Sequence, residues 1–235
     1  MIGLALLLAS LLLMRAEGKG LSELGFNAPL PRARQFAAGL AVAGLAASAQ
    51  QVGYAYVSGT EWIQNPSLSG SLVLDRLRWN ANSVIYEELL FRGYLLYQAI
   101  RILGERRAIL LDACVFGIYH WFSYGVIGNP VAMAYVLLNT GLFGLMFAMA
   151  FSRTGSLALP IGLHLGWNLA TNFIFSAGPL GAGLLIAANG AERLKPHGGP
   201  AALLKFILPA LVVAGVCWYL RQFRTPISRR KDSNE

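Results

Sequence analysis

Residues 83–100 read SVIYEELLFRGYLLYQAI, an apolar stretch that carries two adjacent glutamates and one arginine. An ionised side chain in hydrocarbon costs about 2.5 to 3.5 kcal/mol, so these charges need partners or a function. Glu88 and Arg92 are four residues apart, which puts them on one helix face, where they can share a charge-assisted hydrogen bond. Glu87 points about 100 degrees away from Glu88 and is predicted to face a neighbouring helix or a watery cavity.

The rest of the chain is apolar enough to suggest that a membrane surrounds this stretch. Hydrophobic residues make up 56% of the 235 residues, charged residues only 13%, and the mean hydropathy is +0.54. Runs that are long enough, or nearly so, to cross a bilayer recur along the chain. They are Phe36–Ser58, Ala81–Leu103, Ala108–Phe122, Val131–Phe151, Leu157–Phe175 and Ala202–Leu220. The sequence therefore predicts an all-α, polytopic transmembrane helix bundle of six to seven spans, the seventh being the short apolar run 1–14.

The domain organisation follows from these runs. Residues 1–35 are predicted to form a short first span and an interfacial linker, because basic residues and two prolines follow the first run. Residues 36–220 form the transmembrane bundle, with the chemical motifs within 81–172. Residues 221–235 form a basic tail.

The net charge is +8, and the basic residues cluster at the ends of the predicted spans. This placement argues against a nucleic-acid partner and for a lipid bilayer. With seven spans, most basic residues fall in alternate connections that share one side of the membrane. These are Arg15, Lys19, Arg32, Arg34, Arg101, Arg106, Arg107, Arg153, Arg221, Arg224, Arg229, Arg230 and Lys231. By the positive-inside rule, this side and the C-terminal tail are predicted to be cytoplasmic.

Two histidines decide whether the charges of 83–100 have more than a structural role. A Glu-Glu-x-x-x-Arg run alone is equally consistent with an ion pair that joins two helices, and a lone histidine in an apolar helix is most often hydrogen-bonded to a neighbour. Here His120 lies late in the run 108–122, and His164 lies in the middle of 157–175 with Asn168 four residues further on. Two imidazoles and a spare glutamate in three separate spans favour a composite site.

The predicted topology places the three groups at a similar depth. Glu87 comes early in an inward span, just below the connection 59–80, whereas His120 and His164 lie in outward spans. All three are therefore predicted to lie between the midplane and the extracytoplasmic face. A glutamate, two imidazoles and an amide are the groups that water activation and oxyanion stabilisation require.

Three motifs in this order resemble a known family. EELLFRG (87–93), FGIYH (116–120) and HLGWN (164–168) are similar to the signatures Glu-Glu-x-x-x-Arg, Phe-x-x-x-His and His-x-x-x-Asn of the CPBP family. These intramembrane proteases, often labelled Abi, are related to the type II CAAX prenyl endopeptidase and to bacterial bacteriocin-processing and self-immunity proteins. The resemblance implies a multi-pass enzyme of a bacterial cell membrane that cleaves a membrane protein or a lipid-associated peptide.

The resemblance also implies a role for each matching residue. Glu87 would activate water, His120 would help to hold that water, and His164 with Asn168 would form the oxyanion hole. Glu88 and Arg92 would orient the site or support it. CAAX processing occurs at the cytosolic face, whereas the charge count places this site towards the other face.

Two alternatives stay open. A glutamate and two histidines are a normal zinc ligand set with an open fourth position. The sequence lacks a His-Glu-x-x-His pair, however, and the resemblance implies direct carboxylate catalysis with no cofactor. The other alternative is a non-catalytic protein, either a membrane immunity scaffold or a proton or ion carrier. A carrier needs acids spread through the membrane depth, and we expect the acids here to be confined to one helix, which favours a single reaction centre.

Overall fold

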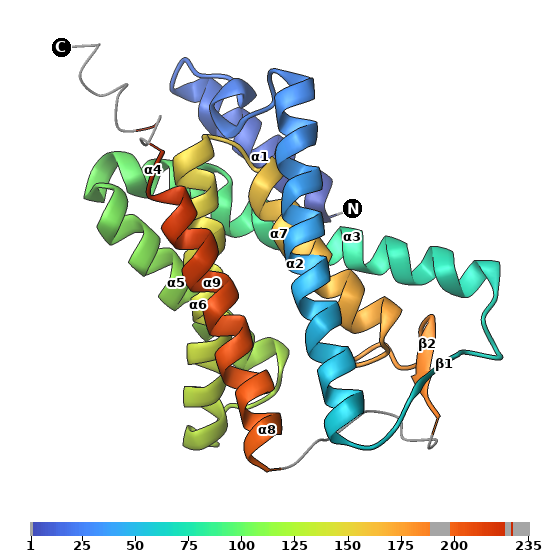
Figure 1. Cartoon of the computed structure of the whole chain (residues 1–235). Helices are drawn as coiled ribbons and strands as arrows, with labels where there is room; N and C mark the ends of the chain where they lie inside the picture. Colours follow the sequence, from blue (N-terminus) through green and yellow to red (C-terminus); the bar gives the residue numbers. More distant parts are fainter. Residues whose placement is uncertain (1, 189–197, 224–226, 228–235) are drawn as a thin grey trace. The chain divides into compact units, whose positions relative to one another are not determined.

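The computed structural model describes residues 2–188, 198–223 and 227 (Figure 1). Most of the predicted tail, 224–226 and 228–235, lies outside the described residues. The α-helices are α1 (Ile2–Ala16), α2 (Pro29–Val57), α3 (Gly70–Arg92), α4 (Tyr94–Leu103), α5 (Glu105–Ser123), α6 (Pro130–Thr154), α7 (Ala158–Asn168), α8 (Gly199–Ala202) and α9 (Leu208–Leu220). Shorter helical turns are η1 (Leu21–Leu24), η2 (Leu169–Ile174) and η3 (Leu203–Ile207). The fold is nearly all-α, as predicted.

One feature departs from an all-helical chain. Strand β1 (Trp62–Gln64) pairs antiparallel with β2 (Leu185–Ala187), with Ile63 opposite Ile186. The connection 59–80 therefore holds a strand, and it is helical from Gly70 onward. Neither the strand nor this helical start was predicted from the sequence.

The chain forms two compact units, and each is described by itself. The first consists of Met1–Phe36, Ile85–Ile161 and Val213–Glu235, and the second of Ala37–Val84 and Gly162–Val212. Helix α3 begins in the second unit and ends in the first. The first two motifs thus lie in the first unit, and the third lies in the second.

Three segments among the described residues are long and apolar enough to cross a membrane. They are Leu21–Val57, Pro130–Thr154 and Gly199–Leu220. A shorter apolar helix covers Gly3–Ala16, where the sequence predicted a short first span. The chain therefore has the helices of a membrane protein, and the count of six to seven spans stays a prediction.

The predicted span Ala81–Leu103 is two helices instead of one, because the helix breaks at Gly93. This residue has φ −74° and ψ −132°, which is not a helical conformation. A Cβ atom there would lie 2.2 Å from the carbonyl oxygen of Leu89 and 3.3 Å from Oγ of Ser10, so only glycine fits. With 10 residues, α4 is about 15 Å long, half the thickness of the hydrocarbon layer. The prediction of one continuous span was wrong.

Basic side chains join the chain connections at one end of the first unit. The contacts are Arg101 to Glu17 (3.0 Å), Arg32 to the carbonyl of Thr154 (3.1 Å), Arg153 to Glu105 (2.8 Å) and Arg153 to the carbonyl of Phe223 (2.6 Å). They bring together the ends of α1, α4, α6 and α9 with the beginnings of α2 and α5. The connections that the charge count assigned to one side thus lie at one end of this unit. Which face of the membrane this end meets stays a prediction.

We expect the contact between the end of α1 and α4 to depend on pH through Glu17. Its carboxylate pairs with Lys19 (2.6 Å) and Arg101 (3.0 Å) and accepts hydrogen bonds from Tyr94 and Gln98. The hydrogen bond from Lys19, followed by that from Tyr94, lowers the pKa of Glu17. A carboxyl group with a lowered pKa stabilises the fold above its ordinary value of about 4.3, and this contribution is lost as the pH falls through the lowered pKa.

The effect is measured by thermal unfolding in detergent between about pH 6 and pH 3. Because the group is exposed, we expect a loss below about 1 kcal/mol. Glu17→Gln removes the titrating group, so its melting temperature should fall less with acid than that of the wild type. Parallel pH curves for the two proteins would contradict the prediction.

Candidate active site

Glu87 on α3 and His120 on α5 face each other in the first unit. Nε2 of His120 lies 3.8 Å from Oε2 of Glu87, and the two side chains are 10% and 11% exposed. Nδ1 of His120 lies 2.7 Å from the backbone oxygen of Phe116. A carbonyl oxygen only accepts, so Nδ1 carries the hydrogen and donates it, and Nε2 is the nitrogen directed at Glu87. Two residues that the sequence assigned to one site are thus brought together.

Aromatic rings fix the orientation of the His120 imidazole. The ring centroid of Phe116 lies 4.5 Å from that of His120, and those of Tyr119 and Tyr124 lie 5.3 Å away. Phe91 packs edge-on against Phe116 at 5.0 Å. The imidazole therefore has little freedom to turn its Nε2 away from Glu87.

Arg92 is fully buried and holds three helices of the first unit together. Nη1 lies 3.4 Å from Oε1 of Glu88, which confirms the ion pair predicted from their spacing. Nε lies 3.1 Å from Oδ2 of Asp112 on α5, and Nη2 donates a 3.1 Å hydrogen bond to the carbonyl of Gly144 on α6. The guanidinium carbon also lies 4.2 Å from the ring centroid of Phe116. One cation thus contacts α3, α5 and α6.

Asp112 belongs to this site and was not predicted from the sequence. It is buried, and it lies inside the predicted span 108–122. The signal was present, because an acid within an apolar run is the feature that drew attention to Glu87 and Glu88. The expectation that the acids are confined to one helix was wrong. The distribution of acids therefore no longer favours a reaction centre over a proton carrier.

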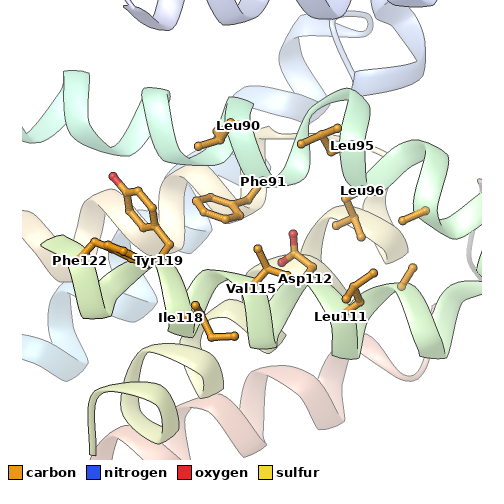
Figure 2. Close-up of a pocket in the computed structure, with 12 residues that line it drawn as sticks. Leu90, Phe91, Leu95, Leu96, Leu111, Asp112, Val115, Ile118, Tyr119 and Phe122 are labelled. Atoms are coloured by element: carbon orange, nitrogen blue, oxygen red, sulfur yellow. The ribbon is translucent and has the colours of Figure 1, made fainter. Parts of the chain in front are cut away.

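An apolar pocket of about 530 Å³ lies between α3, α4 and α5 (Figure 2). Its walls include Phe91, Leu96 and Val115, and Asp112 and Tyr119 bring polar atoms to an otherwise hydrocarbon lining. Phe91 links the pocket to the aromatic rings around His120, because it also packs against Tyr119 at 5.3 Å. The pocket therefore adjoins both the ion cluster and the Glu87–His120 pair.

His164 and Asn168 lie on α7 in the second unit. They are four residues apart and so project from the same helix face, with His164 buried and Asn168 half-buried. A Cβ at Gly166 would lie 2.4 Å from the carbonyl oxygen of Leu40 and 3.0 Å from the nitrogen of Gly44, so α7 meets α2 at Gly166. Gly166 is about 200 degrees around the helix from either residue, so the contact with α2 uses the opposite side of α7. Convergence of the two side chains with Glu87 and His120 stays a prediction.

The helix widens into the π-helical turn η2 directly after Asn168. In this turn Asn172 donates a 3.1 Å hydrogen bond to Oδ1 of Asn80 on α3, and Asn80 donates to the carbonyl of Arg76 at 2.8 Å. Both asparagines are buried. Widened turns of this kind are frequent at functional sites. The bond ties η2 to the part of α3 that belongs to the second unit.

Gly144→Ala is expected to destabilise the first unit by about 1 to 3 kcal/mol, the usual cost of overpacking. A Cβ at Gly144 would lie 3.0 Å from Cδ1 of Phe116 and 3.2 Å from Nη2 of Arg92, both closer than ordinary contacts. Gly141→Ala on the same helix is the matched control, because its nearest atom, the oxygen of Ala113, is 3.4 Å away. Alanine is otherwise favoured in helices by up to about 1 kcal/mol. Equal melting temperatures of the two variants in detergent would show that the contact is not tight.

Residues 70–170 match the family model described as type II CAAX prenyl endopeptidase Rce1-like. No curated protein and no solved structure matches the chain. The matched region contains all three motifs, so the match confirms the resemblance that the motifs indicated. Over residues 70–170 the chain is therefore similar to the Rce1-like type II CAAX prenyl endopeptidases, which are intramembrane proteases.

Proposed function

We propose that this protein is an intramembrane endopeptidase that hydrolyses a peptide bond of a membrane-associated protein or peptide, with Glu87 as the base that activates water. One observation carries the proposal. In the region that matches a protease family, a buried glutamate lies 3.8 Å from the Nε2 atom of His120, whose other nitrogen is hydrogen-bonded to a backbone carbonyl.

This geometry suits a water molecule bound between the two groups. A separation of 3.8 Å is too long for a direct hydrogen bond, but a water can form bonds of about 2.8 Å to both atoms. Glu87 would take a proton from this water while Nε2 of His120 orients it. The oxygen would attack the carbonyl carbon of the peptide, and Glu87 would return the proton to the leaving nitrogen.

The negative charge that develops on the carbonyl oxygen needs donors. His164 and Asn168 are proposed to supply them, because an imidazole and a carboxamide on one helix face can both donate N–H groups to an oxyanion. Glu88 and Arg92 are proposed to support the site. They hold the segment of α3 that carries Glu87 and do not touch the reacting atoms.

The proposal is tested by finding substrates. Membranes that contain the wild type are compared with membranes that contain Glu87→Gln by mass spectrometry of terminal peptides. Asp75→Asn, which removes an exposed acid from the same helix, is the control. We expect new termini in the wild type and in Asp75→Asn but not in Glu87→Gln. Identical termini in all three samples would overturn the proposal.

A second candidate function is a proton carrier, which Asp112 favours because buried acids now lie on both α3 and α5. A carrier would move protons across a vesicle membrane without cleaving peptides. Proton flux into vesicles that contain the purified protein separates the two functions. Flux without any cleavage would favour the carrier.

We expect activity to survive removal of metal. In the proposed mechanism the Glu87 carboxylate itself activates the water, without a metal ion. Zinc held by Glu87 and two histidines is the alternative, and it predicts one zinc per chain that leaves together with activity. Elemental analysis of the purified protein before and after a chelator, with cleavage measured on the same samples, decides between them.

A further inference from the structure

Asp112 lies on the same face of α5 as the residues of the second motif. Asp112, Phe116 and His120 are spaced by four residues, so their side chains follow one stripe along the helix. All three contact residues of α3: Asp112 pairs with Arg92, Phe116 packs on Arg92, and His120 faces Glu87. The stripe is therefore the surface by which α5 meets the helix of the first motif.

Two contacts between polar side chains join α3 and α5 along this stripe. One is Arg92 to Asp112 at 3.1 Å, and the other is Glu87 to His120 at 3.8 Å. The second contact comes earlier on α3 but later on α5, so the two helices run antiparallel here. The two contacts are about 7.5 Å apart along α3 and about 12 Å apart along α5. The spacing of α3 and α5 at one contact thus constrains their spacing at the other contact.

Phe116 connects the two contacts directly. Its ring lies 4.2 Å from the guanidinium carbon of Arg92 and 4.5 Å from the His120 ring, and its carbonyl accepts the hydrogen bond from Nδ1 of His120. A shift of Arg92 relative to α5 would therefore disturb the ring that packs on the imidazole.

The two acids beside Arg92, Glu88 and Asp112, constrain different parts of the structure. Glu88 belongs to the same helix as Arg92, so their ion pair constrains α3 alone. Asp112 belongs to α5, so its pair with Arg92 crosses between the helices. We propose that Asp112 is a positioning residue whose ion pair with Arg92 sets the spacing of α3 and α5 and thereby the distance between Glu87 and His120. This inference rests on the proposed function.

Asp112 also borders the apolar pocket, where Figure 2 shows its carboxylate among apolar side chains. If it contacted a substrate in that pocket, its loss would raise KM. A positioning residue acts on the reacting groups instead, so its loss lowers kcat and leaves KM nearly unchanged. Kinetics therefore separate the two roles.

The first experiment measures kcat and KM of Asp112→Asn with an identified substrate. We expect kcat to fall about 10- to 100-fold, because small misplacements of catalytic groups have effects of this size, and KM to change less than about twofold. Asp112→Glu keeps a carboxylate for Arg92 and should recover part of kcat. Glu105→Gln is the matched control, because it breaks an ion pair of α5 with Arg153, far from the site. An effect on kcat no larger than that of Glu105→Gln would overturn the proposal.

The second experiment needs no substrate. In protein with ¹⁵N-labelled histidine, the Nε2 signal of His120 is assigned with His120→Gln, and its response to Glu87 is calibrated with Glu87→Gln. We expect Asp112→Asn to shift this signal in the same direction and Glu105→Gln to leave it in place. An unshifted signal would refute the positioning role, whether or not the protein is a protease. A shifted signal in a protein that cleaves nothing would uphold positioning and refute the proposed function.

Asp112→Glu replaces Asp112→Asn in this test if Asp112→Asn fails to fold. Its carboxylate can still pair with Arg92, but the side chain is one methylene longer and should move α5. If Asp112→Asn does not fold, Asp112→Glu is expected to show the shifted His120 signal. A wild-type signal in Asp112→Glu would then overturn the proposal.

Discussion

In Glu87→Gln, peptide cleavage is expected to fall by about 10²- to 10⁴-fold, the usual contribution of a general base. The amide has the size of the carboxylate but cannot take a proton from water, so the loss should appear in kcat. The side chain is buried and faces Nε2 of His120, so no bulk solvent base can easily replace it. Single-turnover cleavage of an identified substrate in proteoliposomes measures the effect.

The matched control is Asp75→Asn, which changes an exposed acid on the same helix. It should cleave at the wild-type rate, and both variants should melt near the wild-type temperature. Cleavage by Glu87→Gln at the rate of Asp75→Asn would mean that another group activates the water.

Arg92→Met is expected to have the largest effect on stability. It leaves Glu88 and Asp112 buried without their cation, and breaking a buried ion pair in this way typically costs about 3 to 5 kcal/mol. Methionine keeps much of the volume of the side chain, so the loss reports mainly on charge. The free energy of unfolding in detergent is the measurement.

Two further variants make this prediction specific. Arg78→Met removes an exposed arginine from the same helix and should change the unfolding free energy little. Adding Glu88→Gln and Asp112→Asn to Arg92→Met should recover part of the loss, because removing a whole buried cluster costs less than stranding its anions. If Arg92→Met is no less stable than Arg78→Met, the cluster is not a source of stability.

The ion cluster illustrates what one sequence can and cannot predict. Glu88 and Arg92 are on one helix, and helical geometry alone requires residues four apart to be neighbours. Asp112 is on another helix, and its contact with Arg92 depends on how α3 and α5 are rotated and spaced. No periodicity within either helix contains that information. Glu87 and His120 were predicted to share a site from their similar depth in separate spans and from the order of the motifs, not from any periodicity within one helix.

The helix break at Gly93 could not be predicted from the sequence for a different reason. Hydropathy continues through it without change, and a single glycine within a helix usually costs only about 1 kcal/mol. What ends the helix is local geometry, where any Cβ would meet the carbonyl oxygen of Leu89. The β1–β2 ribbon could not be predicted either, because its two strands have 3 residues each and are far apart in the sequence.

The contacts at the basic end of the first unit and those of Arg92 should respond differently to ionic strength. Arg101 and Arg153 have side chains that are 39% and 22% exposed, whereas that of Arg92 is 0% exposed. Dissolved ions screen exposed pairs over about 8 Å at physiological salt and about 3 Å at 1 M, but they hardly reach a buried pair. We therefore expect concentrated salt to loosen the end where α1, α4, α6 and α9 meet, and the helices that carry Glu87 and His120 to keep their spacing.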